Sequence, residues 1–296
     1  MSYKITLQPS GHRFTAEADE SVLDAALRQG LIIPYSCRGG TCGRCMGKVV
    51  EGEVRYPDGQ PPALSTTEAA IGQALFCQAR PASDLVVEVR EVRRSEDIQP
   101  RRLPCRVAQI DELAHDVRRL WLQLPGNERL QFFAGQYIDI LLKDGRRRGF
   151  SLANAPHADE LLELHIRLVP GGTFTRYVFS ELKEGALLRF EGPFGQFYLR
   201  EDSPRPILML AGGTGFAPLK GIIEHALHTG LERPMHLYWG VRSRRDLYLD
   251  ALPRRWAQEH PNFRYTPVLS EPAAEDDWQG STGWVHEALL ADHPRL

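Results

Sequence analysis

The sequence has no long apolar run and almost no excess of charge of either sign. The run from Ile207 to Ala211 comes nearest to a membrane span, and it is far shorter than the roughly 18 residues that a span requires. The formal net charge of −2 excludes a general attraction to nucleic acid or to anionic membranes. The first ten residues have no signal-peptide pattern, and we find no internal repeat. We therefore expect a cytoplasmic protein with no nucleic-acid partner and no membrane partner.

Cysteine is scarce, with five in the chain. Cys37, Cys42 and Cys45 have the spacing C-x4-C-x2-C, and Cys77 follows well downstream. This spacing is typical of plant-type [2Fe–2S] ligation, in which two bridged irons need four thiolates that converge from different sides. Glycines in the loop let the backbone turn tightly, so that its amides can point at the sulfurs. The sequence therefore predicts a [2Fe–2S] cluster held by Cys37, Cys42, Cys45 and Cys77.

Two other uses of these cysteines fit the sequence less well. A structural zinc site usually has two C-x2-4-C pairs, whereas here a triple is joined by a single cysteine. Disulfides require an oxidising compartment, for which the first residues give no signal. The fifth cysteine, Cys105, follows Pro104 and precedes a strand-like segment, so we expect it to be a buried structural thiol.

Length and composition suit a globular protein of two or three domains, with 42% apolar and 25% charged residues in a chain of 296. We predict domains at residues 1–92, 105–202 and 203–296, and a basic linker at residues 93–104. The linker has little to bury, so we expect a solvated tether, with docking to a partner protein as the alternative.

Alternating and capping patterns organise the first domain. Ser21 is a typical N-cap for a helix that begins at Val22 and ends at Gly30, and Ser65 with Glu68 has the form of a capping box. Strands are expected at residues 3–7, 14–18, 48–54 and 85–89.

The middle and third domains differ in pattern. The third opens with the apolar run 207–210, a glycine-rich turn, a helical segment at 218–228 and a strand at 235–238, which predicts a parallel βαβ sheet. Short alternating segments in the middle domain predict a small antiparallel barrel, with strands at residues 117–124, 137–142, 161–169 and 187–190.

Two segments of the middle domain have residue types that suit a flavin. Arg148-Gly149-Phe150-Ser151 follows a strand, and its arginine, aromatic ring and hydroxyl can hold a pyrophosphate, stack on a flat ring and bond a ring nitrogen. Gly172 and Thr175 precede the helical segment 176–182, whose first N–H groups can face an anion. A helix with an ordinary cap would give the same second pattern.

A glycine-rich turn suits a nucleotide. Gly212-Gly213-Thr214-Gly215, with Pro218, lies at the carboxyl end of a buried strand and opens a helix, where open α/β sheets bind nucleotides. The turn is neither a G-x-G-x-x-G fingerprint nor a P-loop. Its glycines could equally serve close packing of helix and strand.

In this order, the segments resemble the ferredoxin–NAD(P)H reductase-type flavoproteins that have an amino-terminal plant-type ferredoxin domain. Residues 148–151 match the family's Arg-x-Tyr/Phe-Ser flavin motif, Gly172 with Thr175 matches its Gly-x-x-Ser/Thr flavin-phosphate motif, and residues 212–218 match its nicotinamide-nucleotide motif. Tyr238-Trp239-Gly240-Val241-Arg242 matches the ending of the next strand. The resemblance implies a multi-domain α+β and α/β protein with a β-grasp ferredoxin domain, an antiparallel flavin-binding β-barrel and a parallel-sheet nucleotide-binding domain.

Within this family the sequence is most similar to the CDP-6-deoxy-Δ3,4-glucoseen reductases. Three segments carry this similarity: Pro-Tyr-Ser-Cys at residues 34–37, Ala-Gly-Gln-Tyr-Ile-Asp at 134–139 and Ser-Leu-Ala-Asn-Ala-Pro at 151–156. Reductase components of multicomponent oxygenases share most of these features.

The resemblance implies that NADH, with NADPH as the alternative, delivers a hydride to FAD, and that the cluster passes electrons singly to a separate protein. The expected acceptor is a dehydrase that makes deoxysugars, and an oxygenase or hydroxylase component is the alternative. A third hypothesis is an electron-carrier module that cannot use NAD(P)H directly. The domain order favours FAD over FMN. Arg242, Arg244 and Arg245 could meet a 2′-phosphate and favour NADPH, whereas the resemblance favours NADH.

The resemblance also assigns residues to each group. Phe150 and Ser151 face the flavin ring as the catalytic pair, with Ser151 near the reactive nitrogen. Arg148, Arg167 and Thr175 hold the ribityl and phosphate groups, with Gly172 in the same motif. The nicotinamide nucleotide is assigned to Gly212, Gly213, Thr214, Gly215, Pro218, Gly240 and Arg242.

Two features depart from the family pattern. Phe150 stands where tyrosine is frequent, so ring stacking is kept and a phenolic hydrogen bond is lost. The sequence ends at Leu296 without the family's Cys-Gly-Pro-like motif, so we expect the parallel sheet to lack its C-terminal end. Outside the motifs, His225 and His228 have no evident third ligand, so we expect a packed or solvated pair and no metal site.

Overall fold

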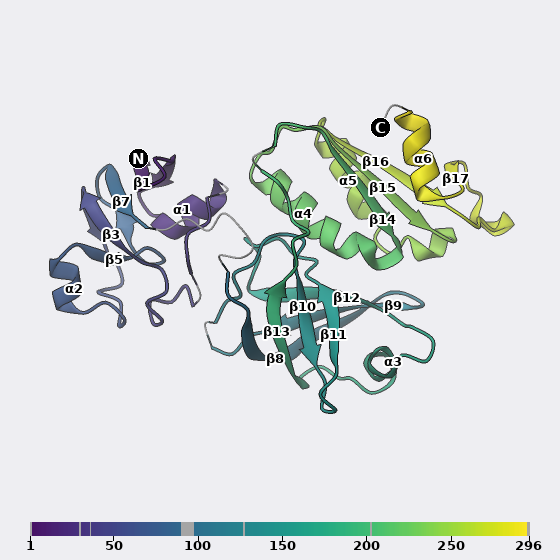
Figure 1. Ribbon diagram of the computed structural model, residues 1–296, viewed down its shortest axis with the longest axis horizontal. Helices are drawn as coiled ribbons and strands as arrows, with labels where there is room; N and C mark the ends of the chain where they lie inside the picture. The colour runs from purple at the N-terminus through teal and green to yellow at the C-terminus, as the bar shows by residue number, and fades with distance from the viewer. Residues whose placement is uncertain are drawn as a thin grey trace.

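Three large sheets organise the computed structural model (Figure 1). They follow one another along the chain, and each has its own cluster of buried apolar side chains. This arrangement agrees with the predicted multi-domain α+β and α/β class, while the boundaries at residues 92, 104 and 202 stay predictions. Residues 90–97, which include the first five residues of the predicted linker, lie outside the described part. The structure describes residues 2–29, 31–35, 37–89, 98–126, 128–201 and 203–294.

The first sheet has the β-grasp arrangement that the resemblance implies. Its five strands run in the order β2-β1-β7-β3-β5, in which β1 and β7 are parallel and the other neighbours are antiparallel. Helix α1 (Val22–Arg28) buries five of its residues in the core of this domain. The strands are β1 (Ser2–Gln8), β2 (Arg13–Glu17), β3 (Met46–Glu51), β5 (Gln73–Leu75) and β7 (Leu85–Glu88).

Both helix caps predicted for this domain are confirmed. Ser21 Oγ accepts a hydrogen bond from the Asp24 amide at 3.0 Å. Ser65 and Glu68 form the full capping box at the start of α2 (Thr66–Ala70). Because each cap satisfies amides that the first helical turn leaves free, these short helices begin at defined residues.

The strand expected at residues 48–54 is wrong in its extent. Gly52 has φ +89°, and a Cβ on it would collide with the Asp84 carbonyl. The chain therefore leaves β3 at Glu51 and restarts as β4 (Val54–Arg55), which pairs with β6 (Arg80–Pro81) in a separate ladder.

The second sheet is antiparallel, with six strands in the order β11-β10-β13-β8-β9-β12. A bridge between Leu152 and Leu164 joins the two outer strands, so the sheet closes into the predicted barrel. Helix α3 (Thr173–Ser180) follows β12. The strands are β8 (Arg101–Ala114), β9 (Val117–Gln123), β10 (Tyr137–Leu141), β11 (Arg147–Ser151), β12 (Leu161–Arg167) and β13 (Leu187–Phe194).

Strand β8 begins inside the segment that the sequence suggests is a linker. Arg101 to Pro104 pair with β13, and Arg102 reaches Glu191 of β13 at 2.8 Å. Arg101 pairs with Glu128 at 2.7 Å. The basic residues that resemble a solvated tether are therefore strand residues with acidic partners.

The third sheet is parallel, in the order β14-β15-β16-β17. Helices α4 (Phe216–His228) and α5 (Ala251–Glu259) cover one face, and α6 (Val285–Asp292) lies on the other (Figure 1). The predicted βαβ order is confirmed, and α4 begins two residues before the expected start. The strands are β14 (Ile207–Gly212), β15 (Met235–Val241), β16 (Phe263–Leu269) and β17 (Ser281–Thr282).

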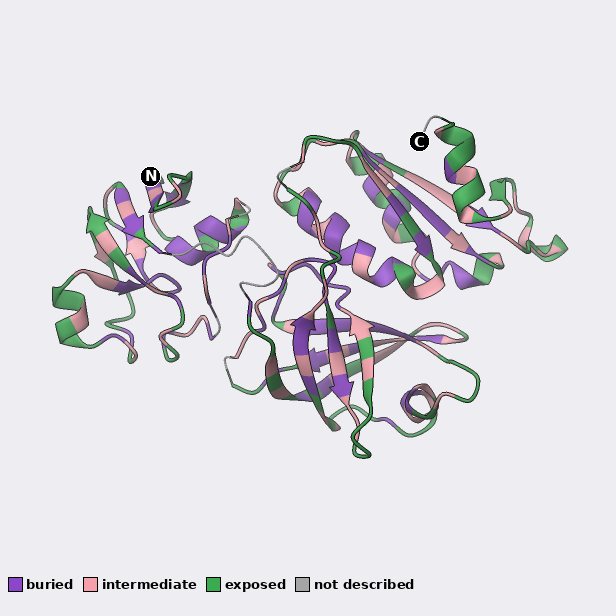
Figure 2. Cartoon of the chain, viewed as in Figure 1, coloured by how far each residue is buried: buried purple, intermediate pink, exposed green. Residues whose placement is uncertain are grey.

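The barrel and the third sheet share apolar packing. Val117 and Ala134 of the barrel belong to the same buried cluster as Phe216 and Trp239 of the third domain. Figure 2 shows this burial as purple along α4 and the strands that face it. The first domain has a separate core, against which the barrel packs Phe133. Among the described residues, no helix is long and apolar enough to cross a membrane.

Candidate functional site

The four predicted cluster ligands come from two segments of the first domain. Cys37, Cys42 and Cys45 lie in the loop between α1 and β3, and Cys77 follows β5. Cys42 is exposed and the other three thiols are buried. The amide of Phe76 donates to the Cys45 carbonyl at 3.2 Å, so the Cys77 segment is held against the end of the loop.

Contacts between the thiols are pairwise. The Cys37 and Cys42 thiols lie close enough to shift each other's pKa, and so do those of Cys45 and Cys77. A tetrahedral zinc site would bring all four sulfurs within about 3.8 Å of one another, given Zn–S bonds of about 2.3 Å. Among the described residues, the thiols form no group of three whose sulfurs all lie within 4.8 Å. Two pairs suit two irons better than one zinc ion.

Backbone amides surround the thiols, as the glycine content predicts. Burial raises the pKa of the Cys37 thiol, but hydrogen bonds from Thr41 and Cys42 outweigh burial and bring that pKa to about 6. The hydrogen bond with Cys77 likewise lowers the pKa of Cys45. Such donors stabilise thiolates and would tune a bound cluster. Backbone N–H groups act to lower the pKa of each thiol: Gly39 and Thr41 for Cys37, Cys37 and Arg44 for Cys42, Cys77 for Cys45, and Gly40 for Cys77. Burial nevertheless leaves the pKa of Cys42 raised, and the neighbouring Cys45 thiol leaves that of Cys77 raised.

The predicted flavin motif lies at an edge of the barrel. Phe150 and Ser151 are half-buried at the end of β11, where Ser151 pairs with Tyr137 of β10. The ring of Phe150 lies 5.6 Å from that of Phe174 in α3. Gly149 between Arg148 and Phe150 is exposed, and a Cβ on it would lie 3.5 Å from the Tyr137 ring. An accessible aromatic surface beside a hydroxyl and an arginine fits a flavin.

The second flavin segment is the turn before α3. Gly172 is the N-cap of this helix and has no side-chain cap, so the first amides of the helix remain available for an anion. A Cβ on Gly172 would lie 2.6 Å from Thr175 Oγ1, so only glycine fits beside this hydroxyl. Thr175 Oγ1 accepts from the Val169 amide at 3.2 Å and thereby fixes the turn.

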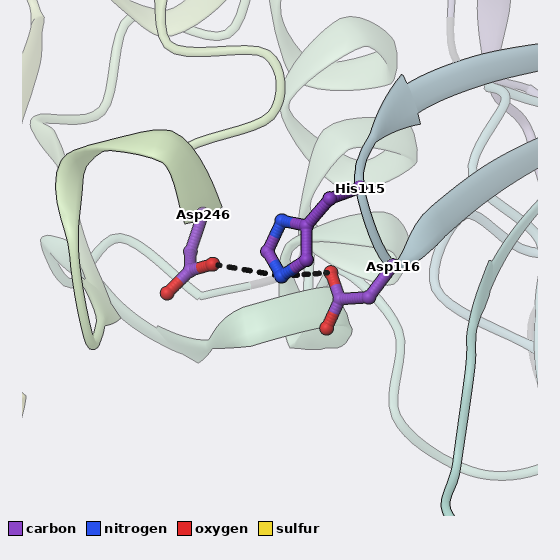
Figure 3. A group of neighbouring side chains, drawn as sticks. All are labelled: His115, Asp116 and Asp246. Atoms are coloured by element: carbon purple, nitrogen blue, oxygen red, sulfur yellow. Dashed lines mark ion pairs between the residues drawn. The ribbon is translucent and has the colours of Figure 1, made fainter.

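Arg167 lies at a different place from the other predicted flavin residues. Its Nε donates to Asp116 Oδ2 at 2.6 Å, and its guanidinium reaches the nucleotide turn, where a Cβ on Gly213 would lie 2.8 Å from the Arg167 Nη1. His115 is next to this pair and lies between Asp116 and Asp246, with its Nε2 3.9 Å from each carboxylate (Figure 3). These contacts join the barrel to the nucleotide domain.

The nucleotide turn is at the carboxyl edge of the parallel sheet. Gly212 and Gly240 are in register on β14 and β15, so the structure brings the two predicted segments together. A Cβ on Gly212 or on Gly215 would meet no atom within 4 Å, whereas one on Gly240 would lie 2.7 Å from Val285 of α6. The open space over Gly212 and Gly215 fits a nucleotide, and Gly240 serves packing.

Trp239 holds the nucleotide turn in place through a hydrogen bond and a ring contact. Its Nε1 donates to the Gly213 carbonyl at 2.9 Å, and its ring stacks on Phe216 at 4.1 Å. Gly213 has φ +51°, a conformation that glycine adopts without strain. Pro218 lies in the first turn of α4, and Arg242 is exposed beyond β15.

A buried charge network, which the motifs do not predict, joins the barrel to α4. Glu163 of β12 is 0% exposed, and its Oε2 lies 2.7 Å from Lys220 Nζ of α4. Its Oε1 lies 3.0 Å from His165 Nε2, and His165 Nδ1 lies 3.0 Å from the Tyr248 hydroxyl. Burial raises the pKa of Glu163, but His165 and Lys220 together bring it to about 2.

A second buried carboxylate, Asp159, faces the first domain. Arg38 Nη1 and Arg129 Nε lie 3.4 and 3.5 Å from Asp159 Oδ1. Neither carboxylate oxygen has a hydrogen-bond partner among the described residues. Burial therefore outweighs both arginines and raises the pKa of Asp159 to about 6. Nearby, Gln131 Nε2 donates to the Ile33 carbonyl at 3.1 Å, which also ties the barrel to the first domain.

The remaining expectations concern residues outside the site. Cys105 is buried and its pKa is raised to about 12 by burial, as expected of a structural thiol. His225 is packed, with Nε2 2.9 Å from Glu201, and His228 stacks at 3.7 Å on His157. Both agree with a packed histidine pair.

Glu163, Lys220 and Asp159 were missed because no motif contains them. The sequence holds one signal: Glu163 and His165 interrupt a strand whose five central residues are all buried, and Lys220 interrupts an apolar helix. Charges in two apolar segments are expected to pair with each other, because an unpaired buried charge is costly.

Known protein families match all three parts. The model of a 2Fe-2S iron-sulfur cluster binding domain matches residues 5–82, that of an oxidoreductase FAD-binding domain matches 104–198, and that of an oxidoreductase NAD-binding domain matches 209–296. One relative is the CDP-6-deoxy-L-threo-D-glycero-4-hexulose-3-dehydrase reductase of Yersinia pestis. It is 40% identical over all 296 residues, and the match spans 88% of its length.

The chain belongs to the iron–sulfur flavoprotein reductases. It is an NAD(P)H-dependent oxidoreductase with [2Fe–2S], FAD and NAD as its cofactors, as its motifs predict. The reductase subunit of an aromatic O-demethylase from Amycolatopsis is 40% identical over 291 residues, 96% of this chain and 85% of that protein. The solved structure of Amycolatopsis cytochrome P450 reductase GcoB is 38% identical with a TM-score of 0.63, and the match covers 99% of this reductase and 87% of that chain.

We expect Cys77→Ser to remove the cluster from the reductase, because the second thiol pair then loses a ligand. Iron content should fall to background, and the visible spectrum should lose the cluster contribution and keep that of the flavin alone. Cys105→Ser is the matched control, since that thiol is buried far along the sequence in β8, and it should keep full iron content. Loss of iron in the control, or zinc in the native protein, would contradict the assignment.

We expect Gly215→Val to weaken NADH binding at least about tenfold, or about 1.4 kcal/mol, because the new side chain fills the open space over the turn. Its melting temperature should stay near that of the native protein, since Gly215 has an ordinary helical φ of −59°. Gly240→Val should do the opposite, because its side chain meets Val285. Unchanged NADH affinity in Gly215→Val would place the nucleotide elsewhere.

The pH dependence of stability should carry the signature of Asp159. Its folded pKa of about 6 exceeds the ordinary 3.8, so between about pH 4 and pH 6 the folded state holds a proton that the unfolded chain has lost. The free energy of unfolding therefore falls as pH rises through this window, by about 1 kcal/mol between pH 5 and pH 6.

Asp159→Asn should remove this contribution. Thermal unfolding of both proteins at pH 5, 6 and 7 would show the difference in melting temperature between native reductase and variant shifting in favour of the variant between pH 5 and pH 6. A smaller shift in the same direction is expected between pH 6 and pH 7. Parallel melting curves across the series would mean that Asp159 titrates normally.

Proposed function

We propose that this reductase supplies electrons to a dehydrase that acts on a CDP-6-deoxyhexulose, as a CDP-6-deoxy-Δ3,4-glucoseen reductase. The observation that carries the proposal is the 40% identity to the Yersinia pestis dehydrase reductase across the whole chain. Protein RfbI of Salmonella typhimurium, 38% identical over 299 aligned residues, also covers the whole chain.

The proposed electron route uses the three sites in order. Residues of the turn at 212–215 hold NADH, and Phe150 with Ser151 faces the flavin ring. Arg148 and Thr175 with Gly172 hold the flavin's ribityl and phosphate groups, and we propose that Arg167 contributes from the nucleotide side. When bound, FAD accepts a hydride and releases electrons singly, and the cluster held by the four cysteines passes them on.

The proposal favours NADH over NADPH. Arg244 is committed to Asp276, to which its amide and its Nη1 are both bonded at 3.2 and 3.0 Å. One of the three arginines that could meet a 2′-phosphate is therefore already paired. Arg242 and Arg245 are exposed.

A second candidate acceptor is an oxygenase component. The Amycolatopsis O-demethylase reductase subunit has the same 40% identity, and the reductase component of Pseudomonas phenol 2-monooxygenase is 37% identical over 296 aligned residues. In either case the partner is an electron-accepting protein. In the third hypothesis, the chain is a carrier module that NAD(P)H does not reduce.

Competition between purified acceptors tests the proposal. With NADH and the holoenzyme, we expect a CDP-6-deoxyhexulose dehydrase to be reduced with a kcat/KM at least about tenfold above that of phenol hydroxylase, and the deoxygenated CDP-sugar to accumulate. A preference for the hydroxylase would replace the proposed acceptor. If anaerobic NADH bleaches neither flavin nor cluster while dithionite bleaches both, the chain is a carrier module.

A further inference from the structure

Helix α4 connects the nucleotide turn to the segment that follows the flavin motif. The helix begins at Phe216, directly after the turn. One turn later, Lys220 Nζ donates to the Ala153 carbonyl at 3.2 Å and to Glu163 Oε2 at 2.7 Å. Ala153 lies two residues after Ser151, so one amine touches the chain close to both proposed cofactor sites.

The contact is largely buried and fixed at backbone level. Lys220 is 6% exposed, and a Cβ on the next residue, Gly221, would lie 2.8 Å from the Asn154 carbonyl. Asn154 Oδ1 in turn accepts the Glu163 amide at 2.9 Å, and the Ala153 amide donates to the Glu163 carbonyl at 2.8 Å. Helix α4 therefore packs directly against the backbone of Ala153 and Asn154, which follow the flavin motif in the chain.

Opposite charges in this location are better suited to fixing a position than to adding stability. Taking two charges out of water costs about as much as their attraction returns, so an apolar pair of the same size would hold the domains equally well. The charged pair instead demands a particular geometry, because each group loses its compensation if the helix shifts. Lys220 is also bonded to Glu224, one helical turn on, at 3.0 Å.

We infer that Lys220, paired with Glu163, is a positioning residue that sets the distance between the nucleotide turn and the flavin motif for hydride transfer. The inference rests on the proposed route from NADH to flavin. Lys220 touches neither group in that route, and its effect passes through the placement of α4 against Ala153. A misplacement of about 1 Å can slow a reaction by about 100-fold.

The expected effect is on the rate of hydride transfer and not on nucleotide binding. In anaerobic stopped-flow experiments on the holoenzyme, Lys220→Met should lower the limiting rate of flavin bleaching by NADH at least about tenfold. The apparent Kd for NADH should change less than about threefold, because the turn itself is intact. Electron flow from dithionite-reduced flavin to the cluster should be unchanged.

A double variant separates position from stability. Lys220→Met alone leaves Glu163 buried without its cation, so a lower melting temperature is expected. Lys220→Met with Glu163→Gln removes both charges and should recover most of the melting temperature while hydride transfer stays slow. Arg254→Gln is the matched control, because it breaks an exposed ion pair with Asp250 on the neighbouring helix and should change neither property.

Recovery of the transfer rate together with the melting temperature in the double variant would overturn the inference, since the pair would then act on stability alone. Native rates in Lys220→Met would do the same. Hydrogen–deuterium exchange gives a readout without turnover: residues 152–155 and 216–222 should exchange faster in both variants than in Arg254→Gln. Native exchange there would also overturn the inference.

The two proposals fail in distinguishable ways. If NADH does not bleach the flavin of the native holoenzyme, the proposed function fails, and the exchange measurement still decides whether Lys220 holds α4 against the flavin segment. If native bleaching is fast and the variants match it, the function stands and the positioning role is wrong.

Discussion

Buried carboxylates on the barrel, each facing cations from a neighbour, are the constraint on which the rest of this reductase depends. Glu163 meets Lys220 of the nucleotide domain at 2.7 Å, and Asp159 meets Arg38 of the first domain at 3.4 Å. Electron transfer through three sites requires that three domains keep fixed distances. The barrel satisfies this requirement by presenting one acid to each neighbour, and the two acids are four positions apart in the chain.

The two acids behave differently because their partners lie at different distances. Glu163 has hydrogen bonds from Lys220 and His165, which keep it ionised far below neutral pH. Asp159 has cations nearby but no hydrogen bond among the described residues, so burial dominates. The interface at Glu163 is therefore insensitive to pH in the physiological range. The interface at Asp159 contains a carboxyl group whose pKa of about 6 lies near the lower end of that range.

Sequence patterns predicted the parts of the molecule that local chemistry determines. The cysteine spacing, the capping box at Ser65 and the turn after β14 depend on neighbours along the chain, and each lies where its pattern indicates. Strand β8 was missed at its start because Arg101 and Arg102 read as a solvated run. Their acidic partners, Glu128 and Glu191, lie far along the sequence, so only the fold makes these residues strand-like. The Lys220–Glu163 pair was missed for the same reason.

The four thiols differ in solvent exposure, and this difference bears on where electrons can leave the first domain. Three are enclosed by the first domain, and Cys42 alone opens to solvent. In the proposed cluster, Cys42 is then the ligand at which the cluster comes nearest to the protein surface. The route for electrons from a cluster at these thiols to solvent is therefore shortest on the Cys42 side.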